Sequence, residues 1–476
     1  MQAKFSSPMI FFSITILMSM ACSSGTSVEV VAGNENTASG TLRVSQSNPR
    51  YFTDGSGKAI YLTGSHTWAN LVDQGPTDPP PAFDYDGYLD FLKSYNHNFI
   101  RLWAWATAKY EQTWKPEPNP KYAAPLPWPR TGPGTALDGK PKFNLTQFNQ
   151  EYFDRLRSRI IAARDRGIYV SIMLFEGYDA SDPLLWSGNP FNINNNVNGI
   201  NGDPNGDGVG IETHTLSIPA VTDLQKAYIR KTIDTVNDLD NVLYEIVNES
   251  SAQSKDWQYA LINYIKQYEA TKPKQHPVGM TAYLTPKNMD LFNSPADWVS
   301  PGWEIWGNDP YQINPPASDG SKVIILDTDH LWGIGGDRVW VWKSFTRGYN
   351  PIYMDVPSLS IFDWFGTIWN LNDARKAMGH TLTYANKMNL IAMTPRNDLS
   401  STAYCLGNPG KEYLIYQPES NTSFSVNLKT GTYSFEWFNP GSGTIVSKGT
   451  FTAITEKQSF TPPFTGDSVL YLIASE

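Results

Sequence analysis

The sequence is poor in cysteine and in basic residues, and both shortages exclude classes of protein. Two cysteines in 476 residues are too few for a disulfide framework or a cysteine-rich zinc site. The 37 basic residues are outnumbered by 46 acidic ones, and they form no cluster. This argues against nucleic acid as a partner, because such binding rests on neutralising phosphates. Charged residues make up only 17% of the chain, so it does not have the composition of a disordered protein.

The sequence also lacks an apolar run that would cross a membrane comfortably. The apolar run over residues 9–20 follows Lys4 and leads into Cys22, as in a secretory signal peptide. A cysteine after a small residue is typical of a bacterial lipoprotein, although Ser19 stands where that signal usually has leucine. We expect a signal peptide over 1–21, lipidation of Cys22, a tether over 22–41 and a lipoprotein exported to the outer membrane or cell surface, with no other membrane contact. An ordinary signal peptide and a periplasmic or secreted protein are the alternative.

What the sequence does have is a regular alternation of β-rich apolar runs with helical patterns. Eight such strands indicate a (β/α)8 TIM barrel, here over residues 42–394 with a hairpin at 42–63. A doubly wound parallel sheet is the alternative for the same pattern, but it fits the sequence less well, because no glycine-rich phosphate loop follows the first strand. The predicted strands are 59–64, 99–105, 168–175, 242–247, 278–284, 297–300, 323–326 and 351–356. The clearest predicted helices are 148–166, 221–238, 254–271 and 373–389.

Two other regions depart from this alternation. Residues 106–147 and 177–220 are long segments that each follow a strand, so we expect both at the carboxyl end of the barrel. From Pro395 the pattern changes to short alternating strands separated by turns rich in Asn, Gly and Pro. We therefore predict a small antiparallel β-sandwich over residues 395–476, packed on the barrel.

Acidic side chains end two of the predicted strands. The fourth strand ends in Asn248-Glu249, and strand alternation places Glu249 on the same face as Glu245. The seventh strand leads into Asp327 and Asp329. Because carboxyl ends of barrel strands meet at one rim, these acids are expected to face each other there. Two carboxylates across a cleft are what glycoside hydrolysis requires, with the amide of Asn248 holding a sugar hydroxyl.

These strand ends, with Arg101 on the second strand, resemble the barrel clan of retaining glycoside hydrolases. Residues 48–68 resemble the apiosidase-like glycoside hydrolases, and residues 431–443 and 460–472 resemble the collagen-binding-type module that often follows them. The resemblance implies that Glu249 is the general acid/base and that the seventh-strand acid is the nucleophile. The clan has Glu there, whereas this chain offers Asp327 as first candidate and Asp329 as second. The separation of the two carboxyl groups, which would decide retention or inversion, is left open.

Other residues at the same rim are candidates for substrate binding, each with a structural alternative. Arg101 could simply neutralise Glu245, and Glu176 could support another acid. His66 could be a structural histidine, and His330 could tune one of the acids. Tryptophans could stack on sugars or belong to the core. The full set of substrate-binding candidates is His66, Arg101, Trp103, Glu176, Asn248, Asp329, His330, Trp332 and Asp355, with Trp186 as a further stacking candidate.

One segment resembles the start of a calcium loop. Asp203, Asn205 and Asp207 alternate ahead of Gly208, but the twelfth position is His214 where such a loop has Glu. A polar loop held by Asx turns is the alternative. We expect no required cofactor, and structural calcium only at this loop.

Together these features predict an exported glycoside hydrolase acting on an oligo- or polysaccharide, such as a plant-type or other complex glycan. A non-catalytic glycan- or matrix-binding surface lipoprotein is the alternative from another class. A lyase or transglycosidase using the same acids is a third. The sugar, its linkage and the oligomeric state are left open.

Overall fold

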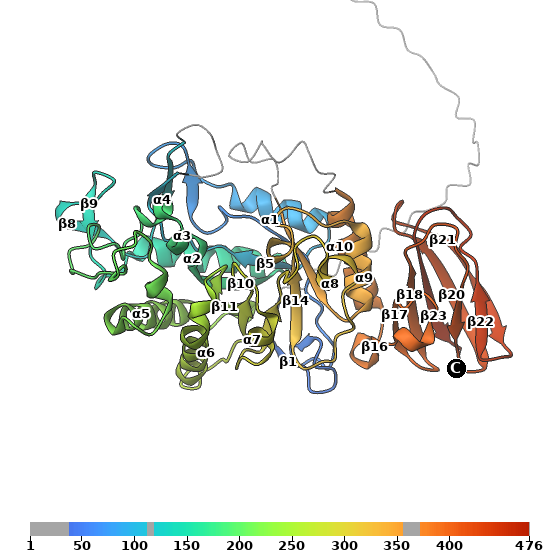
Figure 1. The fold of residues 1–476 in the computed structure, drawn as a ribbon. Coiled ribbons are helices and arrows are strands. Elements are labelled where there is room, and N and C mark those ends of the chain that lie inside the picture. The colour runs from blue at the N-terminus through green and yellow to red at the C-terminus, as the bar shows by residue number, and fades with distance from the viewer. Residues whose placement is uncertain (1–37, 112–118, 356–371, 476) are drawn as a thin grey trace, which may run out of the picture. The chain divides into compact units, whose positions relative to one another are not determined.

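The computed structural model describes residues 38–111, 119–355 and 372–475, and its centre is a parallel sheet of eight strands (Figure 1). The order along the sheet is β3-β15-β14-β13-β12-β11-β10-β5. The two end strands meet, because Asn98 N donates to Thr63 O (3.0 Å) and Thr63 N donates to the Asn98 side chain (2.9 Å). The predicted (β/α)8 barrel is confirmed. Its strands are β3 Gly64–His66, β5 Phe99–Leu102, β10 Tyr169–Glu176, β11 Val242–Asn248, β12 Val278–Thr281, β13 Trp298–Ser300, β14 Val323–Asp327 and β15 Asn350–Met354.

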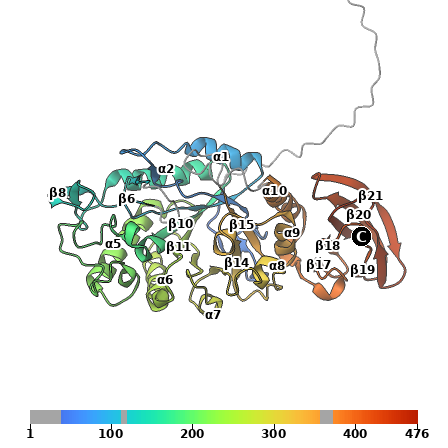
Figure 2. The ribbon, with the colours of Figure 1, turned by 45° about the horizontal axis from the view of Figure 1, so that its top comes forward.

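Helices surround this sheet (Figure 2). The longer ones are α1 Tyr85–Ser94, α2 Gln150–Arg164, α5 Pro219–Val236, α6 Lys255–Glu269, α9 Arg338–Thr346 and α10 Asn372–Lys387. The shorter ones are α3 Tyr178–Ser181, α4 Pro183–Trp186, α7 Asn288–Phe292 and α8 Pro310–Ile313, with 3-10 turns at Ile211–His214, Ala252–Ser254, Thr328–His330, Leu390–Ala392 and Asn397–Leu399. Helix α9 was not among the clearest predicted helices because it buries residues all round, including Trp340, Val341 and Trp342, and so has no polar stripe.

The interior of the barrel is layered by the two-residue period of its strands. Its lower layer is apolar and includes Phe99, Leu243 and Ile325, which pack in one buried cluster. Two residues further along the same strands come Arg101, Glu245 and Asp327. Because side chains alternate between the faces of a strand, this second set also points inward, one layer closer to the carboxyl ends. The polar layer of Arg101, Glu245 and Asp327 therefore lies directly above the apolar layer, which is called the apolar floor below.

The N-terminal hairpin closes the amino end of the barrel. Strands β1 Arg43–Val44 and β2 Phe52–Thr53 pair antiparallel, and Leu42 and Phe52 join the apolar floor. The first barrel strand begins later than predicted, at Gly64, since within residues 59–63 only Ile60 forms a bridge, to Phe52. The end of the predicted tether, residues 38–41, is packed against the barrel: Ala38 N donates to Arg164 O at 3.3 Å.

The two long insertions lie side by side at the carboxyl end of the barrel. The first carries β6 Lys109–Tyr110, β7 Lys121–Ala124, β8 Arg130–Thr135 and β9 Pro141–Phe143, and β7 also pairs with β4 Asp73–Gly75. The second carries α3 and α4. Main-chain bonds join the insertions, from Ala108 N to Gly188 O (3.1 Å) and from Phe143 N to Asn195 O (2.8 Å). They therefore form one wall beside the site.

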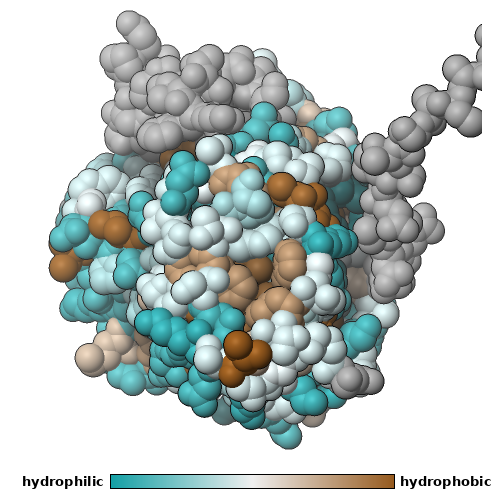
Figure 3. All heavy atoms as spheres, turned by 90° about the vertical axis from the view of Figure 1, so that its right-hand side faces the viewer, coloured by the Kyte–Doolittle hydropathy of each residue, from teal (hydrophilic) through white to brown (hydrophobic). Residues whose placement is uncertain are grey.

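The C-terminal part is antiparallel, as the predicted sandwich requires. A six-stranded sheet has the order β16-β17-β18-β23-β20-β21, and β19 pairs with β22. An apolar cluster that includes buried Cys405 lies within it. Hydrophobic and hydrophilic side chains are interspersed on the face shown in Figure 3. The strands are β16 Thr394–Pro395, β17 Cys405–Asn408, β18 Glu412–Gln417, β19 Phe424–Asn427, β20 Gly431–Asn439, β21 Thr444–Ala453, β22 Lys457–Phe460 and β23 Ser468–Ala474.

Polar and aromatic contacts join this sheet to the barrel helices. Glu436 on β20 accepts bonds from Lys387 (2.8 Å) and Tyr384 (2.7 Å) of α10. Trp342 of α9 stacks on Tyr416 of β18, with ring centroids 6.0 Å apart. The predicted signal peptide and Cys22 lie outside the described residues. Within the described ranges no helix is long and apolar enough to cross a membrane.

Candidate active site

Arg101 is the centre of a buried polar layer inside the barrel. Its Nε and Nη2 donate to the two oxygens of Glu245, at 2.9 and 2.5 Å, which is the ion pair expected from the sequence. Its Nη1 donates to Asp327 (2.8 Å) and Asp329 (3.1 Å), and Nη2 also reaches Asn248 Oδ1 (2.7 Å). The Arg101 guanidinium, which is 1% exposed, thus donates hydrogen bonds to three carboxylates. This shortage of positive charge makes it costly to ionise all the acids together.

Asp327 is the best-paired acid of the layer. It ends β14, as predicted, and His66 lies within 2.8 Å of its Oδ2 while Arg101 donates to the same oxygen. Oδ1 accepts the main-chain N–H of Asp329 at 3.0 Å. Burial favours the neutral form, but His66 and Arg101 outweigh it and hold the pKa of Asp327 below its usual range. Asp327 is 0% exposed, so the structure places a fixed negative charge there, beneath the rim.

Asn248 has its orientation set by its partners. Arg101 can only donate, so the oxygen of the amide must face it and the Nδ2 group must face Glu176, at 3.4 and 3.5 Å. His330 Nε2 lies 3.1 Å from the same oxygen and therefore donates. Burial lowers the pKa of His330 to about 3, so its ring is neutral and its Nδ1 accepts from Ser300 at 2.9 Å. His330 thus contacts the amide, with Asp329 further away at 3.9 Å.

Glu249 breaks the strand pattern predicted for it. Its φ of +45° is in the left-handed region, which costs a non-glycine residue roughly 1–3 kcal/mol. The strand ends at Asn248, and this turn redirects the chain. Strict alternation would place Asn248 on the face opposite Glu245, yet Arg101 bonds to both. The expectation of simple alternation is therefore wrong at the last residues of the strand, where strain of this kind often marks a functional position.

Among the described acids of this site, Glu249 and Asp329 have the fewest hydrogen-bond partners. Burial, and next the charge of Asp329, raise the pKa of Glu249 to about 8. Burial also raises the pKa of Asp329 to about 6, although Arg101 opposes this. Among the described residues only Arg101 donates to the Asp329 carboxylate, and both residues are only partly buried. At pH 7 the arrangement therefore holds a protonated Glu249 near an ionised Asp329.

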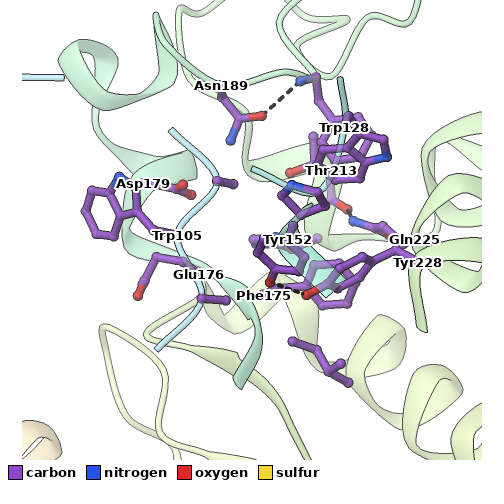
Figure 4. Close-up of a pocket in the computed structure, with 16 residues that line it drawn as sticks. Trp105, Trp128, Tyr152, Phe175, Glu176, Asp179, Asn189, Thr213, Gln225 and Tyr228 are labelled. Carbon is purple, nitrogen blue, oxygen red and sulfur yellow. Dashed lines mark hydrogen bonds between the residues drawn. The ribbon is translucent and has the colours of Figure 1, made fainter. Parts of the chain in front are cut away.

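Glu176 connects this site to a cavity of about 30 Å³, room for a water molecule (Figure 4). Figure 4 shows Glu176, Asp179 and Trp105 on one side and a group of aromatic rings on the other. Burial and the nearby Asp179 raise the pKa of Glu176 well above its ordinary value. Burial likewise raises the pKa of Asp179 to about 7. Glu176 is therefore a buried carboxyl group beside Asn248, and its burial favours the neutral form.

The remaining residues that were predicted to bind substrate are occupied by contacts with other protein groups, so they present neither an open ring face nor an unpaired acid. Trp103 is 3% exposed, with His66 stacked 5.5 Å away and Arg101 5.0 Å from its ring. Trp332 packs edge-on against Trp340 at 5.6 Å. Asp355 is bound by Arg375 through two contacts of 2.5 and 2.7 Å.

Trp186 is 2% exposed, so it offers no surface to a sugar. His66 is likewise enclosed, at 1%, and serves Asp327. Ser300 and Thr281 belong to the site but were not predicted. Ser300 donates to His330, and Thr281 lies 3.4 Å from Glu245. Both end barrel strands, which is the signal that could have identified them.

The resemblance to a calcium loop is not matched by the geometry. The two oxygens of Asp203 accept the main-chain N–H groups of Gly206 (2.8 Å) and Gly208 (3.0 Å). Asp207 accepts from Val209 N (3.1 Å) and from the Asn205 side chain, which therefore donates there. Over the described ranges no group of three or more His, Cys, Asp or Glu residues could hold a metal. The contacts favour the alternative of a loop held by Asx turns.

Comparisons with known proteins relate this architecture to one class of fold. Residues 112–285 match the family described as "Domain of unknown function (DUF6298)". A structure described as a glycoside hydrolase aligns over 92% of this chain and 97% of its own, with a TM-score of 0.56 and 12% identity. A glycoside hydrolase family 5 protein from Bacteroides vulgatus ATCC 8482 aligns over 91% and 94%, with a TM-score of 0.56 and 13% identity.

A second protein of that organism, provisionally described as a glycoside hydrolase, aligns over 93% of this chain and 84% of its own, with a TM-score of 0.60 and 16% identity. The chain therefore shares the barrel fold of these proteins. The search of curated proteins gives no match.

Proposed function

We propose that this protein is a glycoside hydrolase that cleaves O-glycosidic bonds of a plant-type or other complex glycan. The observation that carries the proposal is the pair Glu249 and Asp329, which differ in protonation near neutral pH although they lie close enough to influence each other. Such a pair supplies the acid and the base that glycoside hydrolysis needs. The similarity of fold to glycoside hydrolases supports the same function.

Glu249 is the proposed general acid. Its raised pKa keeps it protonated at pH 7, so it can give its proton to the glycosidic oxygen as the bond to the leaving sugar breaks. The amide of Asn248 is 1% exposed and its Nδ2 group faces Glu176, so we assign it to holding this strand end in place rather than to binding a sugar hydroxyl. His330 and Arg101 fix the orientation of this amide from the other side.

The second carboxylate is Asp327 or Asp329, and the geometry favours Asp329. Both oxygens of Asp327 are occupied and its side chain is fully buried, so it must break an ion pair before it could meet a sugar. Asp329 is the less buried residue and is bound by one donor. It would attack the anomeric carbon in a retaining reaction, or take a proton from the attacking water in an inverting one. Asp327 then serves as the charge that holds Arg101 and His66.

The test is hydrolysis of aryl glycosides and polysaccharides by Glu249→Gln, Asp329→Asn and Asp327→Asn, with exposed Glu419→Gln as control. We expect the first two to lose about 10³-fold or more in kcat/KM while remaining folded. NMR of the first product anomer decides between retention and inversion. Full activity in Glu249→Gln would overturn the proposal. Saccharide binding without turnover across the panel would favour the non-catalytic binding protein, and unsaturated or transferred products would favour a lyase or transglycosidase.

Finer features of the proposal rest on the sequence. The resemblance of residues 48–68 to apiosidase-like glycoside hydrolases supports a complex glycan substrate, and that of residues 431–443 supports a C-terminal accessory module. We propose export by the segment 1–21 and anchoring through a lipid on Cys22, followed by a short tether. Membrane fractionation of Cys22→Ser tests the anchor. A variant that stays in the membrane fraction would contradict it.

A further inference from the structure

The loop between β13 and α8 presents two tryptophans at the carboxyl end of the barrel. Its residues 301–309 begin directly after Ser300, and α8 marks its far end in Figure 1. Trp303 and Trp306 meet edge to face, with centroids 5.1 Å apart and planes at 75°. Trp306 is 63% exposed and is the only exposed tryptophan among the residues the structure describes. An edge-to-face pair leaves one indole face free for another flat ligand.

Hydrogen bonds hold this loop in place. Asp309 accepts from the main-chain N–H groups of Glu304 (2.8 Å) and Ile305 (3.4 Å). Asn288 and Gly302 exchange two bonds, at 2.8 and 2.9 Å, and Asn288 N donates to the Glu304 carboxylate at 2.7 Å. The exposed Trp306 ring and the partly buried Trp303 ring are therefore carried on a constrained backbone. A ligand that binds them pays little for ordering the loop.

The loop is joined directly to the proposed catalytic site. Trp303 N donates to the main-chain oxygen of His330 at 3.1 Å. His330 follows Asp329 in the chain, and its ring contacts Asn248. Strand β13, from which the loop departs, pairs with β14, which ends in Asp327. The loop that carries the tryptophan pair is thus hydrogen-bonded to the segment that carries Asp329, on the side of the sixth and seventh strands.

We propose that Trp303 and Trp306 form a stacking platform for a pyranose ring of a glycan chain, next to the sugar that is cleaved. Ile305, next to Trp306, is 60% exposed, so the tip of the loop presents contiguous apolar surface, and such surface is a feature of binding sites. An indole face matches the flat C–H face of a pyranose and leaves the sugar hydroxyls in water. The inference rests on the proposed function and narrows it: the substrate is an oligo- or polysaccharide that extends beyond the cleaved residue.

The test compares binding and turnover of the full-length protein with those of Trp306→Ala, Trp306→Phe and Trp303→Ala. Binding is measured by native electrophoresis in gels containing xyloglucan, mixed-linkage β-glucan, glucomannan, arabinoxylan or rhamnogalacturonan. We expect at least one polymer to retard the wild type, and Trp306→Ala to weaken that binding roughly tenfold. Trp306→Phe should stay within about threefold, since it keeps an aromatic face. Ile454→Ala, at a residue 81% exposed on the C-terminal sheet, is the matched control and should bind as the wild type does.

Kinetics give the second readout. We expect Trp306→Ala to raise KM for the polymer with little change in kcat, and to leave kcat/KM for an aryl monoglycoside within about twofold. Equal effects on polymer and aryl glycoside, or no retardation by any of the five polymers, would overturn the platform. So would a wild-type dimer that Trp306→Ala converts to a monomer in light scattering, because a second copy would then cover the rings. Trp306-dependent binding without hydrolysis would instead support the platform and overturn the proposed function.

Discussion

The pH dependence of kcat/KM distinguishes Asp329 from Asp327 as the partner of Glu249. The active form requires protonated Glu249 and an ionised second carboxylate. With pKa values of about 8 for Glu249 and about 6 for Asp329, the profile is a bell with its maximum near pH 7. At pH 4 the ionised fraction of Asp329 is about one in a hundred, so kcat/KM should fall about a hundredfold. At pH 9 the protonated fraction of Glu249 gives about a tenfold fall.

If Asp327 were the reacting carboxylate, kcat/KM would depend differently on pH on the acidic side of the profile. The pKa of Asp327 is held below the usual value by His66 and Arg101 against the effect of burial. If Asp327 were the reacting acid, more than half of it would remain ionised at pH 4, and kcat/KM would stay within about twofold of its pH 7 value. The assay is hydrolysis of the best aryl glycoside from pH 4 to 10 at constant ionic strength, with circular dichroism at each pH as the control for folding.

Two outcomes would refute this reasoning. A profile that is flat from pH 7 down to pH 4 would exclude Asp329 and return the role to Asp327. A profile without a basic limb would exclude Glu249 as the acid. NMR titration gives an independent check, because the charge of Asp329 helps to raise the pKa of Glu249. In Asp329→Asn the pKa of Glu249 should therefore fall.

Four further perturbations have defined outcomes. Glu249→Asn should have a free energy of unfolding about 1 kcal/mol higher than that of Glu249→Gln in urea denaturation, because asparagine tolerates the left-handed backbone at φ +45°. Equal urea midpoints would contradict backbone strain at this position. Arg101→Met should lower the free energy of unfolding by about 3–5 kcal/mol, since it leaves two fully buried acids without their counter-charge, and Glu245→Met added to it should recover part of that loss. Glu436→Gln should cost about 1–2 kcal/mol at pH 7 by weakening the bonds from Lys387 and Tyr384. Burial opposes ionisation of Glu436, but these bonds lower its pKa. Its contribution is therefore fully present above the unfolded-state pKa and is lost as the pH falls through the lower folded-state pKa, where the variant and the wild type should converge. Chelator should leave the melting temperature unchanged, because the oxygens of Asp203 are used by main-chain N–H groups, and a downward shift would restore the calcium loop.

Periodicity was sufficient to predict the barrel, because each strand is a short apolar run and the four clearest helices are amphipathic. Helices 150–164, 219–236, 255–269 and 372–387 lie within two residues of their predicted ends. The first strand was placed too early, since residues 59–63 are apolar and β-rich without forming the ladder. Helix α9 lacks a polar face because it is covered by both the barrel and the C-terminal sheet. Local pattern cannot report a helix that is buried on all sides.

The sequence by itself determined that Glu249 and Asp327 stand at the carboxyl ends of two barrel strands, because each follows a short apolar run. The two-residue period did not place the side chains of Glu249 and Asp329, since Glu249 turns at φ +45° and Asp329 lies in the 3-10 turn Thr328–His330. It also determined that Arg101 and Glu245 face inward together. Only the tertiary structure decided how the charge is shared. Whether a carboxylate is protonated depends on its burial and on partners from other strands, such as His66 on β3 for Asp327 on β14, 261 positions apart in the chain. That contact, with the one from Arg101, lowers the pKa of Asp327, whereas burial raises the pKa values of Glu249 and Asp329. No local pattern in the sequence reports these long-range contacts.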